Sequence, residues 1–164
     1  MSDPAIDDAR DDDVAAILAI YNEVIAHSTA VYSELPVTLE DRLSWCRARR
    51  AQGYPILVAR APDVVGYATF GDFRTWPGYR FTVEHSVHVR ADRRGQGIGA
   101  QLVAALIPRA QALGKHVIVG GIDADNAASI RMHERLGFER TAHMRQVGWK
   151  FGRWLDLVFM QRLL

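Results

Sequence analysis

The stretch V-E-H-S-V-H-V-R-A-D-R-R-G-Q-G-I-G-A-Q-L-V-A-A-L, residues 83–106, decides how this chain is organised. Residues 81–89 have the β-branched and aromatic content of a strand. The polar turn after them carries glycine on alternate positions, at Gly95, Gly97 and Gly99. Apolar residues then recur at helical spacing, so a helix is expected to begin within the glycines: Ile98, Leu102, Val103, Leu106 and Ile107.

A strand, a glycine loop and a helix in this order direct free backbone N–H groups at an anion. The first turn of a helix has N–H donors without internal partners, and the helix dipole adds partial positive charge there. Glycine allows a phosphate to approach the backbone without meeting a Cβ. Arg93 and Arg94 add full charges at the mouth of the loop. The loop is therefore predicted to bind a phosphate group, with a purely structural turn as the alternative.

The spacing of the glycines indicates which phosphate ligand to expect. Nicotinamide cofactors call for G-x-G-x-x-G, whereas this loop reads G-x-G-x-G. A Walker loop ends in Gly-Lys-Ser/Thr, which does not occur here. The form R-x-x-G-x-G, at Arg94, Gly97 and Gly99, resembles the pyrophosphate-binding motif of the GNAT superfamily of N-acetyltransferases.

This resemblance implies acetyl-CoA as the co-substrate. In GNAT enzymes the strand before the loop is splayed, and its exposed amides hold the pantetheine arm and the acetyl carbonyl. The implied cofactor-binding residues are Val87, His88 and Val89 on the strand and Arg94, Gly95, Gln96, Gly97, Ile98, Gly99 and Ala100 at the loop.

A second motif follows in the segment 126–133. Asn126, Ser129 and His133 are spaced by three and four residues, so on one helix they share a face and line up beside one ligand. The resemblance implies that Asn126, Ser129 and His133 contact CoA, as the pattern N-x-x-S/A-x-x-x-Y does in GNAT enzymes. The usual tyrosine protonates the departing thiolate, and His133 stands in its place. A histidine with only a packing role is the alternative.

Three stretches narrow the resemblance further: T-V-E-H-S-V-H-V, N-A-A-S-I-R-M-H-E-R-L-G-F and K-F-G-R-W-L-D-L-V-F-M-Q. Together they resemble the L-amino acid N-acetyltransferases that act on methionine sulfoximine, methionine sulfone and phosphinothricin. One departure is His88, where these relatives usually have tyrosine. The K-F-G-R-W-L-D-L segment favours methionine sulfoximine or sulfone over phosphinothricin as the substrate.

Acetyl transfer to an amine requires a base, because the amine arrives mostly protonated. Glu84 is the family's candidate, and His85 is the next, although its side chain should point to the opposite face of the strand. Arg74, in the loop Arg74-Thr75-Trp76, is expected to bind the substrate carboxylate, since a guanidinium matches a carboxylate best, with a solvated loop arginine as the alternative. The predicted catalytic residues are Glu84, His133 and His85, and the predicted substrate-binding residues are Arg74, Thr75, Trp76, Glu84, His85 and Ser86.

Overall, 164 residues with 49% hydrophobic and 24% charged content predict one globular domain, residues 1–164. The resemblance implies an α/β fold, a mixed and mostly antiparallel sheet with a splayed central strand and helices on both faces. A net charge of +1 gives no reason to expect nucleic acid or a membrane as a partner. The single Cys46 and the acidic N-terminus predict a cytoplasmic protein. No metal is expected, because no residues have metal-ligand spacing.

Smaller features complete the expectations. Thr38 with Asp41 indicates a capping box at the start of a second helix, whose Arg47, Arg49 and Arg50 would form a solvated face. The aromatic tail 149–160 and the family resemblance predict a homodimer.

Two other classes of function stay open. One is an NAD(P)-dependent oxidoreductase, although too few residues follow Gly99 for the rest of a two-half dinucleotide fold. The other is a non-catalytic acyl-CoA sensor.

Overall fold

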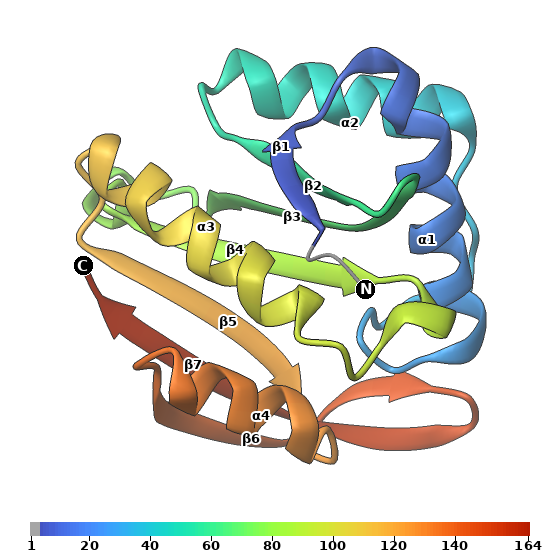
Figure 1. The fold of residues 1–164 in the computed structure, drawn as a ribbon. Helices are drawn as coiled ribbons and strands as arrows, with labels where there is room; N and C mark the ends of the chain where they lie inside the picture. The colour runs from blue at the N-terminus through green and yellow to red at the C-terminus, as the bar shows by residue number, and fades with distance from the viewer. Residues whose placement is uncertain (1–3) are drawn as a thin grey trace.

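The computed structural model describes residues 4–164, which form a seven-stranded sheet with helices on both faces. The strands lie in the order β1-β2-β3-β4-β5-β7-β6, and all neighbours are antiparallel except β4 with β5 (Figure 1). The predicted α/β fold is confirmed. The strands are β1 (Ala5–Asp8), β2 (Ile56–Arg60), β3 (Val64–Asp72), β4 (Thr82–Val89), β5 (Val117–Asp123), β6 (Glu139–Lys150) and β7 (Arg153–Leu163), and the helices are α1 (Val14–His27), α2 (Leu39–Ala51), α3 (Ile98–Ala112) and α4 (Ala127–Arg135).

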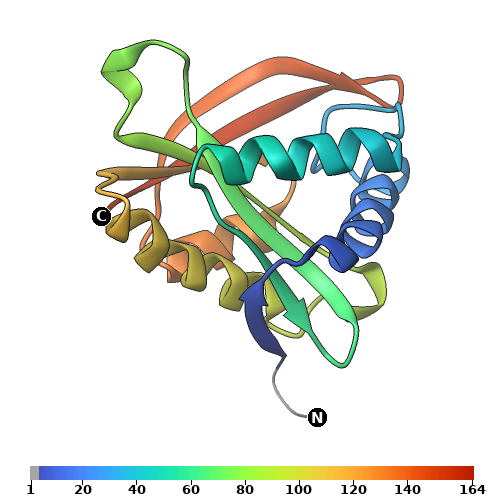
Figure 2. The ribbon, with the colours of Figure 1, turned by 90° about the horizontal axis from the view of Figure 1, so that it is seen from above.

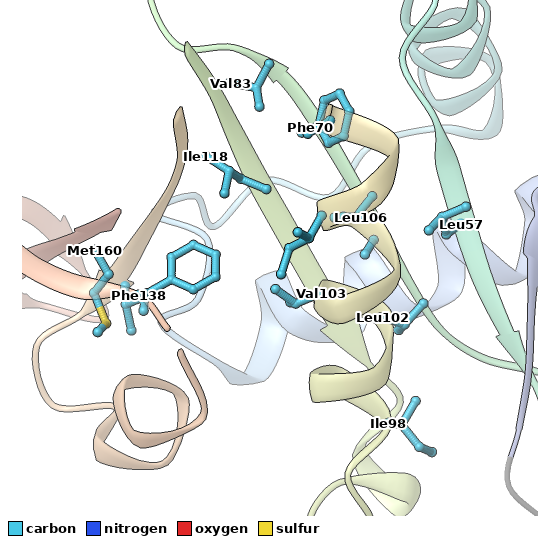
Figure 3. Packing of buried hydrophobic residues seen from close by; sticks show 14 of the residues in the cluster. Leu57, Phe70, Val83, Ile98, Leu102, Val103, Leu106, Ile118, Phe138 and Met160 are labelled. Atoms are coloured by element: carbon cyan, nitrogen blue, oxygen red, sulfur yellow. The ribbon is translucent and has the colours of Figure 1, made fainter. Parts of the chain in front are cut away.

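Two apolar cores lie on the two faces of the sheet, because successive residues of a strand point in opposite directions. On β2, Leu57 belongs to the core under α3, whereas its neighbour Val58 belongs to the core under α1 and α2. Figures 1 and 2 show α2 and α3 on opposite sides of the sheet. The core under α3 is drawn in Figure 3 and includes Leu102, Val103 and Leu106 with Phe70, Val83 and Ile118.

The helix boundaries follow from local chemistry. Gly97, with φ +80°, is the N-cap of α3, so the helix begins within the glycines as predicted. The predicted capping box is confirmed at α2, where Thr38 Oγ1 accepts from Asp41 N–H and the Asp41 carboxylate accepts from Thr38 N–H. The prediction that Arg49 belongs to a solvated face of α2 is wrong. Arg49 is half-buried and donates to the Phe70 carbonyl at 3.0 Å.

The feature that positions the site is the separation of β4 from β5. Their parallel pairing runs from Thr82 and Val117 only to His85 and Gly120. Beyond this point β4 pairs with β3 alone and β5 with β7 alone. One edge of residues 86–89 is therefore free of strand pairing, which confirms the splayed central strand.

Candidate active site

Two adjoining cavities meet at the separation of β4 and β5. The first, here called the splay cavity, has a volume of about 380 Å³ and is lined by β4, the end of β5 and side chains of α1, α2 and α4. The second, the glycine-loop channel, has a volume of about 700 Å³ and runs between the loop before α3 and the face of α4. Both volumes fall within the range of ligand sites. Residues shared by the two cavities are Ala30, Val87, His88, Asn126 and Ser129.

The glycine-loop channel collects most of the predicted cofactor residues: Val87, His88, Val89, Arg94, Gly95, Gly97, Ala100, Asn126 and Ser129. Gly95 and Gly97 have positive φ, and a Cβ on either would meet no atom within 4 Å, so their backbone is open to a ligand. Arg131 and Arg135 of α4 line the same channel and were missed by sequence reasoning. A loop with free helix-terminal N–H groups and basic side chains fits a pyrophosphate.

Four predicted cofactor residues have other surroundings. Ile98 is buried in the core under α3, and Gly99 faces inward, where a Cβ would lie 3.4 Å from Met132 Sδ. Gln96 is exposed, and its Oε1 accepts from Arg93 Nε at 3.3 Å. His133 lines the splay cavity instead of the channel. Three of these residues thus contribute to packing and loop structure: Ile98 and Gln96 through their side chains, and Gly99 through its Cα.

Two adjacent glycines of β5 leave space for side chains on the two faces of β4. A Cβ on Gly121 would lie 3.1 Å from Glu84 Oε1, whereas a Cβ on Gly120 would lie 2.8 Å from His85 Nε2. Glu84 and His85 thus point to opposite faces, as strand geometry predicts. Both still line the splay cavity, because the cavity opens where the strands part.

His85 and His133 form a buried pair. The two Nε2 atoms are 3.0 Å apart, and His133 Nδ1 lies 2.7 Å from the Ser129 carbonyl oxygen. A carbonyl only accepts, so His133 carries its proton on Nδ1, and its bare Nε2 accepts from His85 Nε2–H. His85 Nδ1 is then left without a proton and is buried without a hydrogen-bond partner. Burial, with smaller contributions from His133 and His88, lowers the pKa of His85 to about 3.

Glu84 occupies the face of β4 that looks toward α1 and α2. Partial burial raises the pKa of its carboxyl above the usual value, and the charge of Arg74 opposes that rise. A carboxylate with a raised pKa at a cavity wall is a stronger base than an ordinary carboxylate.

His88 lies on the same face and is buried between aromatic rings. Its ring centroid is 5.4 Å from that of Tyr67 and 6.1 Å from that of Tyr21. Burial, followed by the charges of Arg42 and Arg94, lowers the pKa of His88 to about 4. The neutral ring therefore fills an aromatic position at physiological pH, which explains how the site accommodates histidine there.

The predicted substrate loop does not join the cavities. Arg74, Thr75 and Trp76 are all exposed, and none of them lines the splay cavity. Arg74 Nη1 donates to its neighbour's carbonyl, that of Phe73, at 2.9 Å. Its charge nevertheless acts on Glu84, so the loop lies within electrostatic reach of the site.

The sequence interpretation missed the wall of the splay cavity formed by α1 and α2: Tyr21, Arg42, Trp45, Arg49 and Tyr67, the last from β3. Arg42 is only 6% exposed. One signal pointed to it, because Arg42 is four residues before the buried Cys46 and thus shares its helical face. A charge on an apolar stripe deserves a functional explanation.

The loop over the junction of the two cavities is held by the C-terminal hairpin. Lys150 is fully buried, and its ammonium donates to the carbonyls of Ser28 at 2.6 Å and Val31 at 2.8 Å. Tyr32 Oη donates to the Asp156 carbonyl at 3.0 Å, and its ring packs so closely on Gly148 that a Cβ there would lie 2.3 Å away. The segment K-F-G-R-W-L-D-L thus fastens the loop that carries Ala30, which lines both cavities.

The described part of the chain, from residue 4 onward, holds no group of three His, Cys, Asp or Glu side chains that could bind a metal ion. Within the same range, each helix is either too short or too polar to span a bilayer.

The splayed strand, the glycine loop and the second cavity define an acetyltransferase of the GNAT type. The sequence profile of the acetyltransferase (GNAT) family matches residues 14–138, and the chain belongs to this family. It is an N-acetyltransferase.

Among its relatives is an L-methionine sulfoximine/L-methionine sulfone acetyltransferase of Pseudomonas paraeruginosa, 57% identical over 96% of this chain and 92% of the relative. A phosphinothricin N-acetyltransferase of Alcaligenes faecalis is 38% identical over 94% and 80%. The solved structure of yncA, a putative acetyltransferase from Salmonella typhimurium with its cofactor acetyl-CoA, superposes with a TM-score of 0.97 at 50% identity, covering 99% of this chain and 95% of that one.

Proposed function

We propose that the protein transfers an acetyl group from acetyl-CoA to the α-amine of a small amino acid, with methionine sulfoximine or methionine sulfone favoured over phosphinothricin. The observation that carries this proposal is the meeting of the glycine-loop channel with the splay cavity at Val87 and His88. The 57% identical relative is named for the sulfoximine and sulfone, and the phosphinothricin enzyme is more distant, at 38% identity.

The residues of the glycine-loop channel would bind acetyl-CoA. Arg94 and the backbone of residues 95–99 would hold the pyrophosphate at the start of α3, helped by Arg131 and Arg135. The unpaired edge of Val87, His88 and Val89 would offer backbone donors to the pantetheine arm and the acetyl oxygen, a type of contact that stabilises an oxyanion. Asn126 Oδ1 also accepts from Ser129 N–H at 3.1 Å, which fixes the start of α4 beside the channel.

Glu84 would take the proton of the amine, directly or through a water molecule. It faces the splay cavity with a raised pKa, whereas burial makes the competing His85 a weak base that is bonded to His133. The role of the base therefore falls to Glu84.

His133 would position the Ser129 hydroxyl, which would relay the proton that the departing thiolate needs. The Nδ1–H of His133 points to the Ser129 backbone carbonyl, and the Ser129 hydroxyl lies 3.4 Å from the same nitrogen. A neutral imidazole does not release its last N–H proton near neutral pH, so the proton would come from the ammonium that forms when the amine attacks the thioester. Because Ser129 lines both cavities, its hydroxyl would accept that proton as it passes its own to the thiolate. Arg74 remains the proposed partner of the substrate carboxylate because its charge acts on Glu84, although the exposed loop of Arg74, Thr75 and Trp76 does not itself line the splay cavity. Ser86, which does line the cavity, would lie beside the substrate.

Thiol release from acetyl-CoA tests the proposal across methionine sulfone, methionine sulfoximine, phosphinothricin and the common amino acids. The expected result is turnover that is fastest with the sulfone and the sulfoximine. Tight acetyl-CoA binding without turnover of any amine would instead identify a non-catalytic acyl-CoA sensor. Faster turnover of phosphinothricin would favour the alternative substrate.

We further propose a homodimer formed through the β6–β7 hairpin. Edge strand β6, the turn after it and the start of β7 expose large apolar side chains that water does not favour: Met144, Val147, Trp149, Phe151 and Trp154. Light scattering should give twice the chain mass at micromolar concentration. Trp154→Glu should give a folded monomer, and a monomeric parent protein would contradict the proposal.

The cellular setting belongs with this function. We propose a cytoplasmic enzyme that works on small molecules without nucleic acid or membrane as a partner. A net charge of +1 gives little attraction to either surface, and the buried single Cys46 suits a reducing compartment. Fractionation of cells that express the tagged protein should recover it in the soluble fraction.

A further inference from the structure

Arg42 is a buried cation that has no counter-ion. It lies on α2, is 6% exposed, and makes no ion pair with any of residues 4–164. Its Nε is buried without a hydrogen-bond partner. By contrast, the partly buried Arg60 places two nitrogens on the Asp13 carboxylate at 2.7 and 2.6 Å. A buried charge costs several kcal/mol unless it is paired, so Arg42 calls for a partner that the chain does not supply.

Two aromatic rings hold the Arg42 guanidinium in place. Its central carbon lies 3.9 Å from the centroid of Tyr21 and 4.5 Å from that of Trp45. These rings stabilise the charge through their faces but give the N–H groups no acceptor. Since Arg42, Tyr21 and Trp45 all line the splay cavity, a ligand in that cavity can supply the missing acceptor oxygens.

The position of Arg42 indicates which oxygens these are. Glu84 and His88 lie on the same face of β4, with Ser86 between them, and all three line the splay cavity. The Arg42 guanidinium stacks on Tyr21, whose ring centroid is 6.1 Å from that of His88, so Arg42 lies at the His88 end of this face. The α-amine and the α-carboxylate share one carbon, so a carboxylate stays near Glu84 when Glu84 takes the amine proton. The end of the substrate's side chain that is farthest from its α-carbon therefore extends toward Arg42.

We propose that Arg42 binds the oxygens on the side-chain sulfur or phosphorus of the acceptor amino acid and so selects oxidised over unoxidised side chains. The planar guanidinium offers two parallel N–H donors to such a group. Tyr21 and Trp45 provide apolar surface for the methyl group beside the sulfur. The proposal rests on the proposed function, because it assumes that an amino acid binds with its amine at Glu84.

The test compares methionine sulfone with methionine, which differ only in the two sulfonyl oxygens. In Arg42→Met, the ratio of kcat/KM for sulfone over methionine should fall by about 10- to 100-fold, the effect of losing hydrogen bonds from a charged donor. The KM for acetyl-CoA should not change. Arg47→Met makes the same substitution at an exposed position of the same helix and should leave the ratio as it is.

Two results would overturn the proposal. Equal loss of kcat/KM for sulfone and methionine would mean that Arg42 binds the carboxylate or only supports the fold, and wild-type kcat/KM for both compounds would mean that it does not contact the substrate. If Arg42→Met does not fold, Arg42→Gln retains a polar side chain of similar length, and the same ratio decides. Calorimetric titration of each variant with methionine sulfone should give the same ranking without turnover. If the wild-type protein acetylates neither compound, the proposed function fails, and the ratio is not defined.

Discussion

The two faces of β4 make a natural comparison within one strand. On one face Glu84 and His88 line a cavity that a substrate can enter, with Gly121 leaving space beside Glu84. On the other face His85 is enclosed with His133 and Phe138, and Gly120 leaves space beside the pair. Both residues are at least partly buried, and burial raises the pKa of Glu84 and lowers that of His85.

This difference teaches that burial has opposite effects on acids and on imidazoles. Burial disfavours the charged form in both cases, so it strengthens a carboxylate as a base and weakens a histidine. One desolvated strand segment therefore supplies a good base on the open face and neutral, hydrogen-bonded rings on the closed face. The following predictions test that division.

The largest effect is expected from Glu84→Gln, which keeps the shape of the side chain but cannot accept the proton. We expect kcat to fall by roughly 10² to 10⁴, the usual range for removal of a general base. The acidic limb of the pH–rate profile, set by the raised pKa of Glu84, should disappear with it. Wild-type turnover with an unchanged profile would transfer the role of base to His85.

A smaller effect is expected on the closed face. His133→Gln should lower kcat by roughly 10- to 10²-fold. This loss is at or below the low end of the range for removal of a general acid, because a thiolate is already a good leaving group. The acidic limb that belongs to Glu84 should survive in this variant. A kcat within twofold of wild type, in a protein with normal acetyl-CoA affinity, would leave His133 with a packing role only.

The two glycines of β5 allow the faces to be perturbed separately. Gly121→Ala should displace Glu84 by a few tenths of an ångström and lower kcat several-fold, with little change in the melting temperature. Gly120→Ala places its methyl group 2.8 Å from His85 Nε2, so it should disrupt the histidine pair and cost about 1–3 kcal/mol of stability. Thermal unfolding and steady-state kinetics on both variants separate the effects, and the reverse pattern would refute this assignment.

The last prediction concerns the pH dependence of stability and leaves the rate of catalysis aside. His85 and His88 have folded pKa values of about 3 and about 4, below the unfolded value of 6.5. Between pH 6.5 and 4 the unfolded chain binds more protons than the folded one, so the free energy of unfolding falls as the pH falls. His88→Tyr removes one titrating group and should reduce this slope by about 1.4 kcal/mol per pH unit, measured by urea unfolding. An unchanged slope would show that His88 does not stay neutral.

Local patterns in the sequence were sufficient for the frame of the site. The glycine loop, the start of α3 and the helix that carries Asn126, Ser129 and His133 are set by residues close together in the chain, and all were predicted. The opposite orientations of Glu84 and His85 followed from strand periodicity.

The rest depends on contacts between distant residues. His85 meets His133 across 48 positions, and nothing in either segment specifies that contact. Arg42 joins the site because α2 packs beside α1, which contacts β4, and helical periodicity alone does not reveal this arrangement. Periodicity could show only that Arg42 lies on the buried side of its helix.

The fastening made by Lys150 has a consequence for how the enzyme is completed during synthesis. The glycine loop and β4 leave the ribosome well before residue 150. The carbonyls of Ser28 and Val31 gain their hydrogen bonds only after Lys150 has been synthesised. Strand β7, the last to emerge, must also enter between β5 and β6, which were made earlier. A nascent chain can therefore carry the glycine loop before either cavity is enclosed, because Ser28 and Ala30 line the glycine-loop channel and Ala30 and Val31 line the splay cavity.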